Sequence, residues 1–202
     1  MLQVLARWRY RVSEAEAKML APWKVLSTEE SLQTPLFVIR KYSCETPLGG
    51  LVSAYYVHEA LDSVMCACIT EDGLVVVQRQ YRLALRGVSM DYPAGYVSPE
   101  DKTLERAALR ELYEETGFGA DSATHLFSLS KDPSFSSAKM HVFLATGARR
   151  VGVGQDATEL SVPALLHPRE ILEAVKAGEM SCAFCVATSL RLAQILGWDS
   201  EP

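Results

Sequence analysis

Short runs of β-branched and other apolar residues predict two pairs of strands in the first 82 residues. The segments 36–42 (LFVIRKY) and 51–58 (LVSAYYVH) have this character, and the turn-rich segment SCETPLGG separates them. The segments 63–70 (SVMCACIT) and 74–82 (LVVVQRQYR) follow, joined by EDG, which is typical of a hairpin turn. The pattern therefore favours a β-rich first part of the chain.

Helical patterns enter in the second part. Residues 102–116 (KTLERAALRELYEET) contain strong helix formers and no internal Gly or Pro, and Gly117 stands where a C-cap belongs. The other predicted elements are strands at 140–148 and 160–167, a helix at 168–178 that starts with Pro and ends with Gly, and an amphipathic helix at 185–197. Strands and helices mix without strict alternation, which indicates a layered α/β fold.

The first 61 residues differ from the rest. Polar, Pro-containing segments interrupt them at 21–24 (APWK) and 33–36 (QTPL), and their apolar periodicity is too weak for a separate core. We therefore predict that residues 1–61 form a β-rich N-terminal extension that packs on the main domain or on a second copy. Residues 62–202 form the main domain, and we expect a homodimer.

The composition excludes several classes of function. A net charge of −5 over 202 residues provides no basic field for nucleic acid. No apolar stretch approaches the length of a membrane span. Arg7, Arg9 and Arg11 interrupt the first apolar run, unlike a signal peptide. We expect a cytoplasmic protein that binds neither nucleic acid nor membrane.

Two of the five cysteines, Cys182 and Cys185, have C-x-x-C spacing. A structural zinc site would need a second pair, and Cys66 and Cys68 have only C-x-C spacing inside a predicted strand. We therefore disfavour zinc. A redox dithiol is less strongly disfavoured but has no supporting context in the sequence, and we expect buried thiols.

Three acidic residues, Glu111, Glu114 and Glu115, lie within about one turn near the end of the helix predicted at 102–116. Helical spacing makes them continue the stripe of Leu104, Ala107 and Ala108. Their mutual repulsion and the helix dipole both call for a compensating positive charge. A divalent cation such as Mg²⁺ suits oxygen ligands, and a solvated acidic face is the alternative.

The segment RELYEETGF (residues 110–118) resembles the second half of the Nudix box, R-E-U-x-E-E-x-G-U with U apolar, at every fixed position. The segments QRQYR, DYPAG and DATEL, with PREILEAVKAGEM after them, resemble the ADP-ribose pyrophosphatase branch of this family. The resemblance implies a Nudix fold, in which helices sandwich a mixed β-sheet, here with the N-terminal β-rich extension. It covers about residues 60–195 and more weakly the extension, to which it assigns dimerisation and substrate contact.

Two features depart from the family pattern. The spacing from Gly95 to Arg110 is one residue longer than in the full box, so Glu100 or Asp101 replaces the first box glutamate. The segment DPSFSSAK stands where this branch often has S-P-G-x-S-x-E. Ala138 therefore occupies the position of a glutamate that can serve as the catalytic base.

The resemblance implies hydrolysis of a diphosphate in a Mg²⁺-dependent reaction, with Mn²⁺ as an alternative cation. It makes Glu111 and Glu115 the principal metal ligands, with Glu114 alongside, and adds the backbone carbonyl of Ala94. Arg110 would orient the glutamates. Water would attack one phosphorus atom, and metal would neutralise the charge that develops.

The remaining roles fall on residues with structural alternatives. Arg82 is the expected phosphate contact, and Arg79 is the other candidate. The alternative is that these arginines are simply exposed to solvent on the strand. Trp23 is the candidate for stacking on the adenine. The alternative is that Trp23 belongs to the hydrophobic core of the extension. The base is Glu115, or Glu159 or Asp156 in the segment GQDATEL.

The leading hypothesis is a diphosphatase acting on ADP-ribose or a related nucleoside diphosphate sugar. One alternative is the same chemistry on a different nucleotide. Another, which the absent carboxylate at Ala138 favours, is a catalytically weak Nudix domain that binds a nucleotide or a protein partner.

Overall fold

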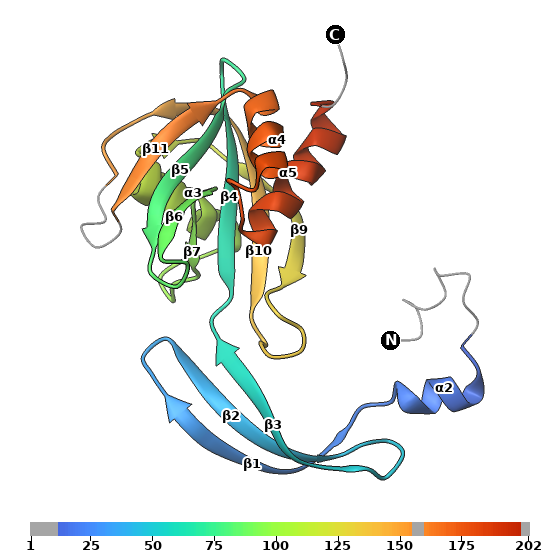
Figure 1. Ribbon diagram of the computed structural model, residues 1–202. Helices are drawn as coiled ribbons and strands as arrows, with labels where there is room; N and C mark the ends of the chain where they lie inside the picture. The colour runs from blue at the N-terminus through green and yellow to red at the C-terminus, as the bar shows by residue number, and fades with distance from the viewer. Residues whose placement is uncertain (1–11, 155–159, 199–202) are drawn as a thin grey trace. The chain divides into compact units, whose positions relative to one another are not determined.

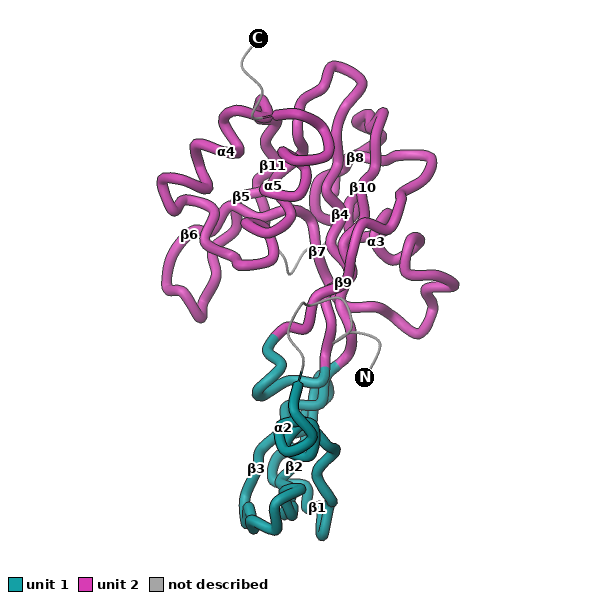
Figure 2. Tube along the Cα trace, turned by 90° about the vertical axis from the view of Figure 1, so that its right-hand side faces the viewer, with its two compact units in different colours: residues 1–60, 132–137 teal, residues 61–131, 138–202 magenta. Residues whose placement is uncertain are grey.

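The computed structural model describes residues 12–154 and 160–198, which divide into two units (Figure 2). Unit 1 holds the chain up to residue 60 together with residues 132–137, and unit 2 holds the remainder. No pattern in the sequence predicts that residues 132–137 belong to unit 1. Among the described residues, no helix is both long and apolar enough to span a membrane.

Unit 1 is built on an antiparallel sheet in the order β1-β2-β3. Its elements are the short helix α2 (Glu14–Met19) and the strands β1 (Lys24–Gln33), β2 (Phe37–Glu45) and β3 (Leu51–Ala60). The segment 132–137 joins it through β3, since the His58 amide donates to the Phe135 carbonyl at 2.7 Å. The sequence analysis predicted β2 and β3 but missed β1, whose ten residues are all exposed and mostly polar.

Unit 2 contains a mixed sheet in the order β11-β5-β4-β10-β8, with β6, β7 and β9 paired to β5, β4 and β10. Its strands are β4 (Ser63–Thr70), β5 (Val75–Arg82), β6 (Gly87–Asp91), β7 (Ala94–Tyr96), β8 (Phe118–Gly119), β9 (Ala123–Ser130), β10 (Lys139–Arg150) and β11 (Ser161–Leu166). Strands β4 and β10 pair in parallel, and the other pairs are antiparallel.

Helices cover both faces of this sheet, α3 on one and α4 and α5 on the other (Figure 1). They are α3 (Leu104–Thr116), α4 (Pro168–Ala177) and α5 (Ala183–Leu196). Each is capped by a glycine in the left-handed conformation, as at Gly117 with φ of 73°. The predicted α/β sandwich is therefore confirmed.

Strand β4 shows why the two helical layers need one continuous apolar strand. Val64, Cys66 and Cys68 pack with α3, whereas Met65 and Ala67 belong to the cluster that includes α4 and α5. Successive side chains of a strand point to opposite faces, so a strand covered on both sides must be apolar throughout.

The segment 91–101, for which the sequence predicts no helix or strand, contains regular structure. It begins with the last residue of β6 and contains β7, which pairs with β4 through Val64 and Gly95. A strand of three residues is too short to give a periodic signal in the sequence. The strands β6, β8 and β9 are also absent from the elements that the sequence predicts.

Candidate active site

The inner face of α3 carries two of the three glutamates of the Nudix-like segment. Glu111 is 8% exposed and Glu115 is 4% exposed, on the same face as the buried Ala107 and Ala108. The Glu114 side chain is 39% exposed. The predicted continuation of the apolar stripe is therefore observed for two acids, and the third lies at its rim. We call Glu111, Glu114 and Glu115 the carboxylate turn.

Arg110 connects the carboxylate turn to the preceding loop. Its Nη1 donates to Glu111 Oε1 at 2.7 Å and to Glu114 Oε2 at 2.8 Å. Its Nε and Nη2 donate to the two oxygens of Asp101 at 3.0 and 2.9 Å, and Nη2 also reaches the Tyr96 carbonyl. The hydrogen bonding with Asp101 is the main cause that raises the pKa of Arg110, while partial burial opposes it.

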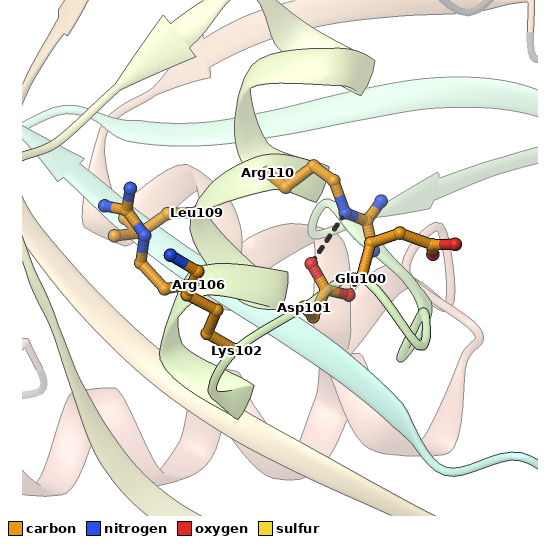
Figure 3. A pocket seen from close by; sticks show the side chains of 6 residues that line it. All are labelled: Glu100, Asp101, Lys102, Arg106, Leu109 and Arg110. Carbon is orange, nitrogen blue, oxygen red and sulfur yellow. Dashed lines mark hydrogen bonds and ion pairs between the residues drawn. The ribbon is translucent and has the colours of Figure 1, made fainter.

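The structure distinguishes the two candidates for the displaced box position. Asp101 faces Arg110 (Figure 3), and this hydrogen bond is the main cause that lowers the pKa of Asp101. The Glu100 carboxylate instead accepts from the Ser98 hydroxyl. The Asp101 amide donates to the Ser98 carbonyl at 3.0 Å, closing a turn. This turn accommodates the extra residue, and Asp101 is the partner of Arg110.

The backbone at Ala94 and Gly95 lies directly against the carboxylate turn. The Ala94 amide donates to Glu115 Oε2 at 2.8 Å. A Cβ added at Gly95 would lie 2.3 Å from Glu111 Oε1 and 2.5 Å from its Oε2. Only glycine leaves room for the Glu111 carboxylate, which accounts for the Ala-Gly pair at this point.

Two residues of the carboxylate turn, Glu111 and Glu114, line a cavity of about 810 Å³ in unit 2, which we call the main cavity, and the buried Glu115 is not among its lining residues. Its wall includes side chains of both charges, which come from the sheet, from α3 and from the loop before β10. The charged lining residues are Arg82, Asp91, Arg110, Glu111, Glu114 and Lys131. A cavity with this mixture suits an anionic ligand bound together with a cation.

The two arginines predicted as phosphate contacts are separated by the strand that carries them. Arg82 lines the main cavity, where its Nε and Nη2 both lie 3.3 Å from Asp91 Oδ2. Arg79 is exposed and is not among the residues that line the cavity. Their spacing of three residues places them on opposite faces of β5.

Lys131 is a cavity residue that the sequence analysis missed. Its Nζ donates to Ser63 Oγ at 2.6 Å and lies 5.0 Å from the centre of the Tyr96 ring. Burial lowers the pKa of Lys131. No motif spacing connects Lys131 to the carboxylate turn, so only the tertiary fold identifies it.

The remaining predicted site residues lie elsewhere. Trp23 belongs to unit 1, where it is 45% exposed and lines a pocket of about 290 Å³ with Tyr42, Cys44, Tyr55 and Val57. Glu159 and Asp156 lie outside the described residues. Ala138 is 1% exposed and is not among the residues that line the main cavity.

A mixed sheet between helices, with a carboxylate-bearing helix beside a cavity, defines the class of an α/β domain of the Nudix type. The model of the NUDIX domain family matches residues 60–180, which is more than half of the chain. The chain therefore belongs to the NUDIX domain family.

Known relatives align over about two thirds of this chain. The chain is 31% identical over 134 residues to the ADP compounds hydrolase NudE of Escherichia coli, covering 64% of this chain and 69% of the relative. It is 30% identical over 130 residues to the ADP-ribose pyrophosphatase of Mycobacterium tuberculosis, covering 64% of this chain and 62% of the relative. A crystal structure of an ADP compounds hydrolase has a TM-score of 0.70 at 24% identity, covering 85% of this chain and 96% of that chain. This likeness shows the shared fold.

Proposed function

We propose that this chain is a Nudix hydrolase that cleaves the diphosphate bond of ADP-ribose or a related nucleoside diphosphate sugar, with Mg²⁺ as its cofactor and Mn²⁺ as an alternative. The observation that carries this proposal is the main cavity, where Glu111 and Glu114 lie in one wall together with Arg82 and Lys131. The names of the two relatives refer to ADP compounds and to ADP-ribose, which supports the same class of substrate.

The donor set of the carboxylate turn fits a hard divalent cation. Glu111, Glu114 and Glu115 offer carboxylate oxygens from adjacent positions of α3, and Gly95 leaves the space that the Glu111 carboxylate needs. These three residues and the Ala94 carbonyl would hold the cation. When bound, it would neutralise negative charge that develops on the phosphate oxygens during cleavage.

The protein's own contacts prepare these ligands before substrate binds. Arg110 fixes Glu111 and Glu114, and the Ala94 amide fixes Glu115. Preorganised ligands need no rearrangement during the reaction, which lowers its free-energy barrier. Arg82 and Lys131 would bind the substrate phosphates, with Arg82 giving up part of its pairing with Asp91.

Two glutamates compete for the role of general base, namely Glu115 and Glu159. Glu159→Gln is expected to suppress turnover and leave cation affinity unchanged if Glu159 takes the proton from water. If Glu115 serves both as a ligand and as the base, Glu115→Gln should weaken both turnover and cation binding. Isothermal titration with Mg²⁺, combined with single-turnover rates, separates the two assignments.

Unit 1 is proposed to mediate homodimerisation and to contribute Trp23 to adenine binding. The exposure of Trp23 and its edge contact with Tyr55, at 6.0 Å between ring centres, support a surface aromatic site. Stacking on a base would contribute ~1–3 kcal/mol. The proposed location is the cytoplasm, which the five free thiols support.

The test is a substrate panel on the purified full chain. ADP-ribose, other nucleoside diphosphate sugars and dinucleoside polyphosphates are incubated with and without Mg²⁺, and the products are identified by mass spectrometry. We expect AMP and ribose 5-phosphate from ADP-ribose only when the cation is present. Saturable binding of ADP-ribose without any phosphate-ester product would instead support the weakly catalytic binding domain.

A further inference from the structure

The main cavity has a second reactive feature in its wall, at the start of α5. Cys182 is the N-cap residue of α5, Cys185 lies in its first turn, and both line the cavity. The two sulfur atoms and a carboxylate oxygen of Asp91 all lie within 4.8 Å of one another. The C-x-x-C pair therefore occupies a helix N-terminus with access to solvent through the cavity.

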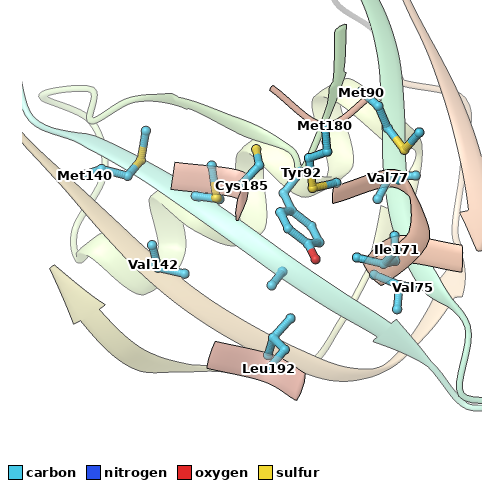
Figure 4. Packing of buried hydrophobic residues seen from close by; sticks show 13 residues of the cluster. Val75, Val77, Met90, Tyr92, Met140, Val142, Ile171, Met180, Cys185 and Leu192 are labelled. Carbon is cyan, nitrogen blue, oxygen red and sulfur yellow. The ribbon is translucent and has the colours of Figure 1, made fainter. Parts of the chain in front are cut away.

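The two thiols have different surroundings. Cys182 is half-buried, whereas Cys185 is 1% exposed and belongs to the same apolar cluster as Tyr92 (Figure 4). Cys185 Sγ donates to Asp91 Oδ1 at 3.7 Å. Interaction with the Cys185 side chain lowers the pKa of the Cys182 thiol to about 6, and the backbone amides of Cys185 and Phe184 act in the same direction, whereas burial and the Asp91 carboxylate oppose the shift. Interaction with Cys182 and burial raise the pKa of Cys185.

The other thiols of unit 2 provide the contrast. Cys66 and Cys68 lie in the middle of β4 and are completely buried. Burial raises the pKa of Cys68 to about 12, and the pKa of Cys66 is raised for the same reason. A reactive cysteine needs both a thiolate and access for its partner, and of these four thiols Cys182 alone combines them.

We propose that Cys182 and Cys185 form a redox-active dithiol, which reacts with low-molecular-weight disulfides of the glutathione type and closes into a disulfide in the wall of the main cavity. Cys182 is the attacking residue and Cys185 is the resolving residue. This site is separate from the carboxylate turn, and its chemistry does not depend on the proposed hydrolase activity.

The reaction proceeds in two exchange steps. The Cys182 thiolate attacks one sulfur of the small disulfide, whose S–S bond breaks, and the first small thiolate leaves and takes a proton from water. Cys185 then attacks Cys182 Sγ in the mixed disulfide, and the second small thiol leaves with the proton that Cys185 loses. The protein dithiol is oxidised by two electrons, and the small disulfide is reduced to two thiols.

The cluster with Asp91 also has the composition of a metal site, but the contacts of Asp91 favour the dithiol. Arg82 contacts Asp91 Oδ2 at 3.3 Å, and Ser89 Oγ donates to its Oδ1 at 2.9 Å. Among the described residues this cluster offers three ligands, one fewer than a structural zinc site uses, and both oxygens of its only carboxylate already have partners.

The first test follows the thiols of the full chain by mass spectrometry. Reduced protein is incubated with oxidised glutathione, quenched with acid and digested with trypsin. Cys182 and Cys185 share the peptide 177–191, because Lys176 precedes it and Arg191 ends it. We expect this peptide to lose two hydrogen atoms and to regain them on treatment with dithiothreitol. The other cysteines should stay reduced.

Variants assign the two roles. Cys185→Ser should stop at a glutathione adduct on Cys182, because the resolving thiol is absent. Cys182→Ser should leave peptide 177–191 unmodified, because Cys185 is buried. Cys68→Ala is the matched control and should react as the wild type does. A wild-type peptide that stays fully reduced, or a Cys185→Ser protein without the adduct, would overturn the proposal.

A second measurement needs no variant. Iodoacetamide labelling of the wild type at a series of pH values, read by peptide mapping, should modify Cys182 at pH 7 and leave Cys68 unmodified. The labelling rate of Cys182 should reach half its plateau near pH 6. If Cys182 reacts no faster at pH 7 than free glutathione does, the dithiol assignment is wrong.

Discussion

The carboxylate turn of α3 and the strand β1 differ in the kind of side chain that each exposes or leaves partly buried. In the carboxylate turn, one guanidinium, that of Arg110, is shared between Asp101, Glu111 and Glu114. In β1, apolar side chains such as Val25, at 54% exposed, and Leu32, at 52% exposed, lie on the surface of a sheet. One region gathers several carboxylates around a single guanidinium, and the other leaves a few apolar side chains exposed on a strand that is otherwise polar.

The difference indicates a different binding partner for each region. Excess carboxylate in a partly buried site is relieved by a cation, which is stabilised by charge and needs little area. The exposed apolar side chains of β1 would be stabilised by burial against another protein surface, and a second copy of the chain is the partner that we propose. The predictions below test each half of this comparison.

The largest expected effect is that of Glu115→Gln. The substitution keeps the size of the side chain and removes its charge, so turnover with ADP-ribose and saturating Mg²⁺ should fall by at least about 100-fold. A cation contributes several kcal/mol to transition-state stabilisation, and each ~1.4 kcal/mol is a factor of ten. Glu173→Gln, which changes an exposed acid on α4, is the control. Unchanged turnover in Glu115→Gln would refute the metal assignment.

Gly95→Ala should displace Glu111 without unfolding the protein. The new Cβ would meet the end of a flexible side chain, so Glu111 must move away. We expect turnover to fall by about 10–100-fold and Mg²⁺ affinity to fall with it. Gly87→Ala is the matched control, because its Cβ would meet no closer atom than the Leu85 carbonyl oxygen at 3.8 Å. Equal rates for the two variants would contradict the role of Gly95.

The comparison also shows what the sequence can predict. Strand β4 was predicted to the residue, because burial on both faces requires a continuous apolar run between turns. Strand β1 was missed, because its ladder with β2 is accompanied by surface ion pairs such as Lys41–Glu29 rather than by an apolar period. An apolar pattern in the sequence reflects burial, and all ten residues of β1 are exposed in the part of the chain that the structure describes.

The same limit applies to the site. Helical spacing placed Glu111 and Glu115 on the inner face, because position along one helix fixes direction. Asp101 and Lys131 lie in loops. Their contacts with Arg110 of α3 and Ser63 of β4 depend on the tertiary fold, which brings these loops close to the site. Such contacts have no fixed spacing in the sequence, so the choice between Glu100 and Asp101 needed the structure.

Leu26→Asp tests the other half of the comparison, since Leu26 is an apolar residue of β1 that is 45% exposed. If β1 is covered by a second copy, the loss of an apolar side chain costs ~1.5–3 kcal/mol, and the dimer dissociation constant rises by tenfold or more. Thr28→Asp adds the same charge on the same strand without removing an apolar side chain. Light scattering over a concentration series measures both variants. A monomeric wild type would refute the proposed dimer.

Divalent cations should stabilise the folded chain by a smaller amount. A ligand at 100 times its dissociation constant contributes ~2.7 kcal/mol, which corresponds to a melting-temperature increase of about 5–10 °C for a chain of this size. Differential scanning calorimetry with Mg²⁺, with Mn²⁺ and with EDTA measures it. Glu115→Gln should lose most of the increase, whereas Glu173→Gln should retain it. An equal increase in both variants would place the cation elsewhere.

The smallest expected effect is that of Asp101→Asn, and it depends on pH. The pKa of Asp101 is lowered in the folded state by its hydrogen bonding to Arg110, so its contribution to stability is present above its unfolded pKa of ~3.9. That contribution is lost as the pH falls through the lower, folded pKa. At pH 7, Asp101→Asn should reduce the free energy of unfolding by about 1.5–3 kcal/mol, the usual range for a hydrogen bond to a charged group. Urea denaturation at pH 7 and at decreasing pH should show the difference from wild type shrinking towards zero. Glu100→Gln, whose carboxylate accepts from the Ser98 hydroxyl rather than from Arg110, should show a smaller difference at pH 7. If Glu100→Gln is the more destabilising of the two, Glu100 and not Asp101 is the acid that supports the carboxylate turn.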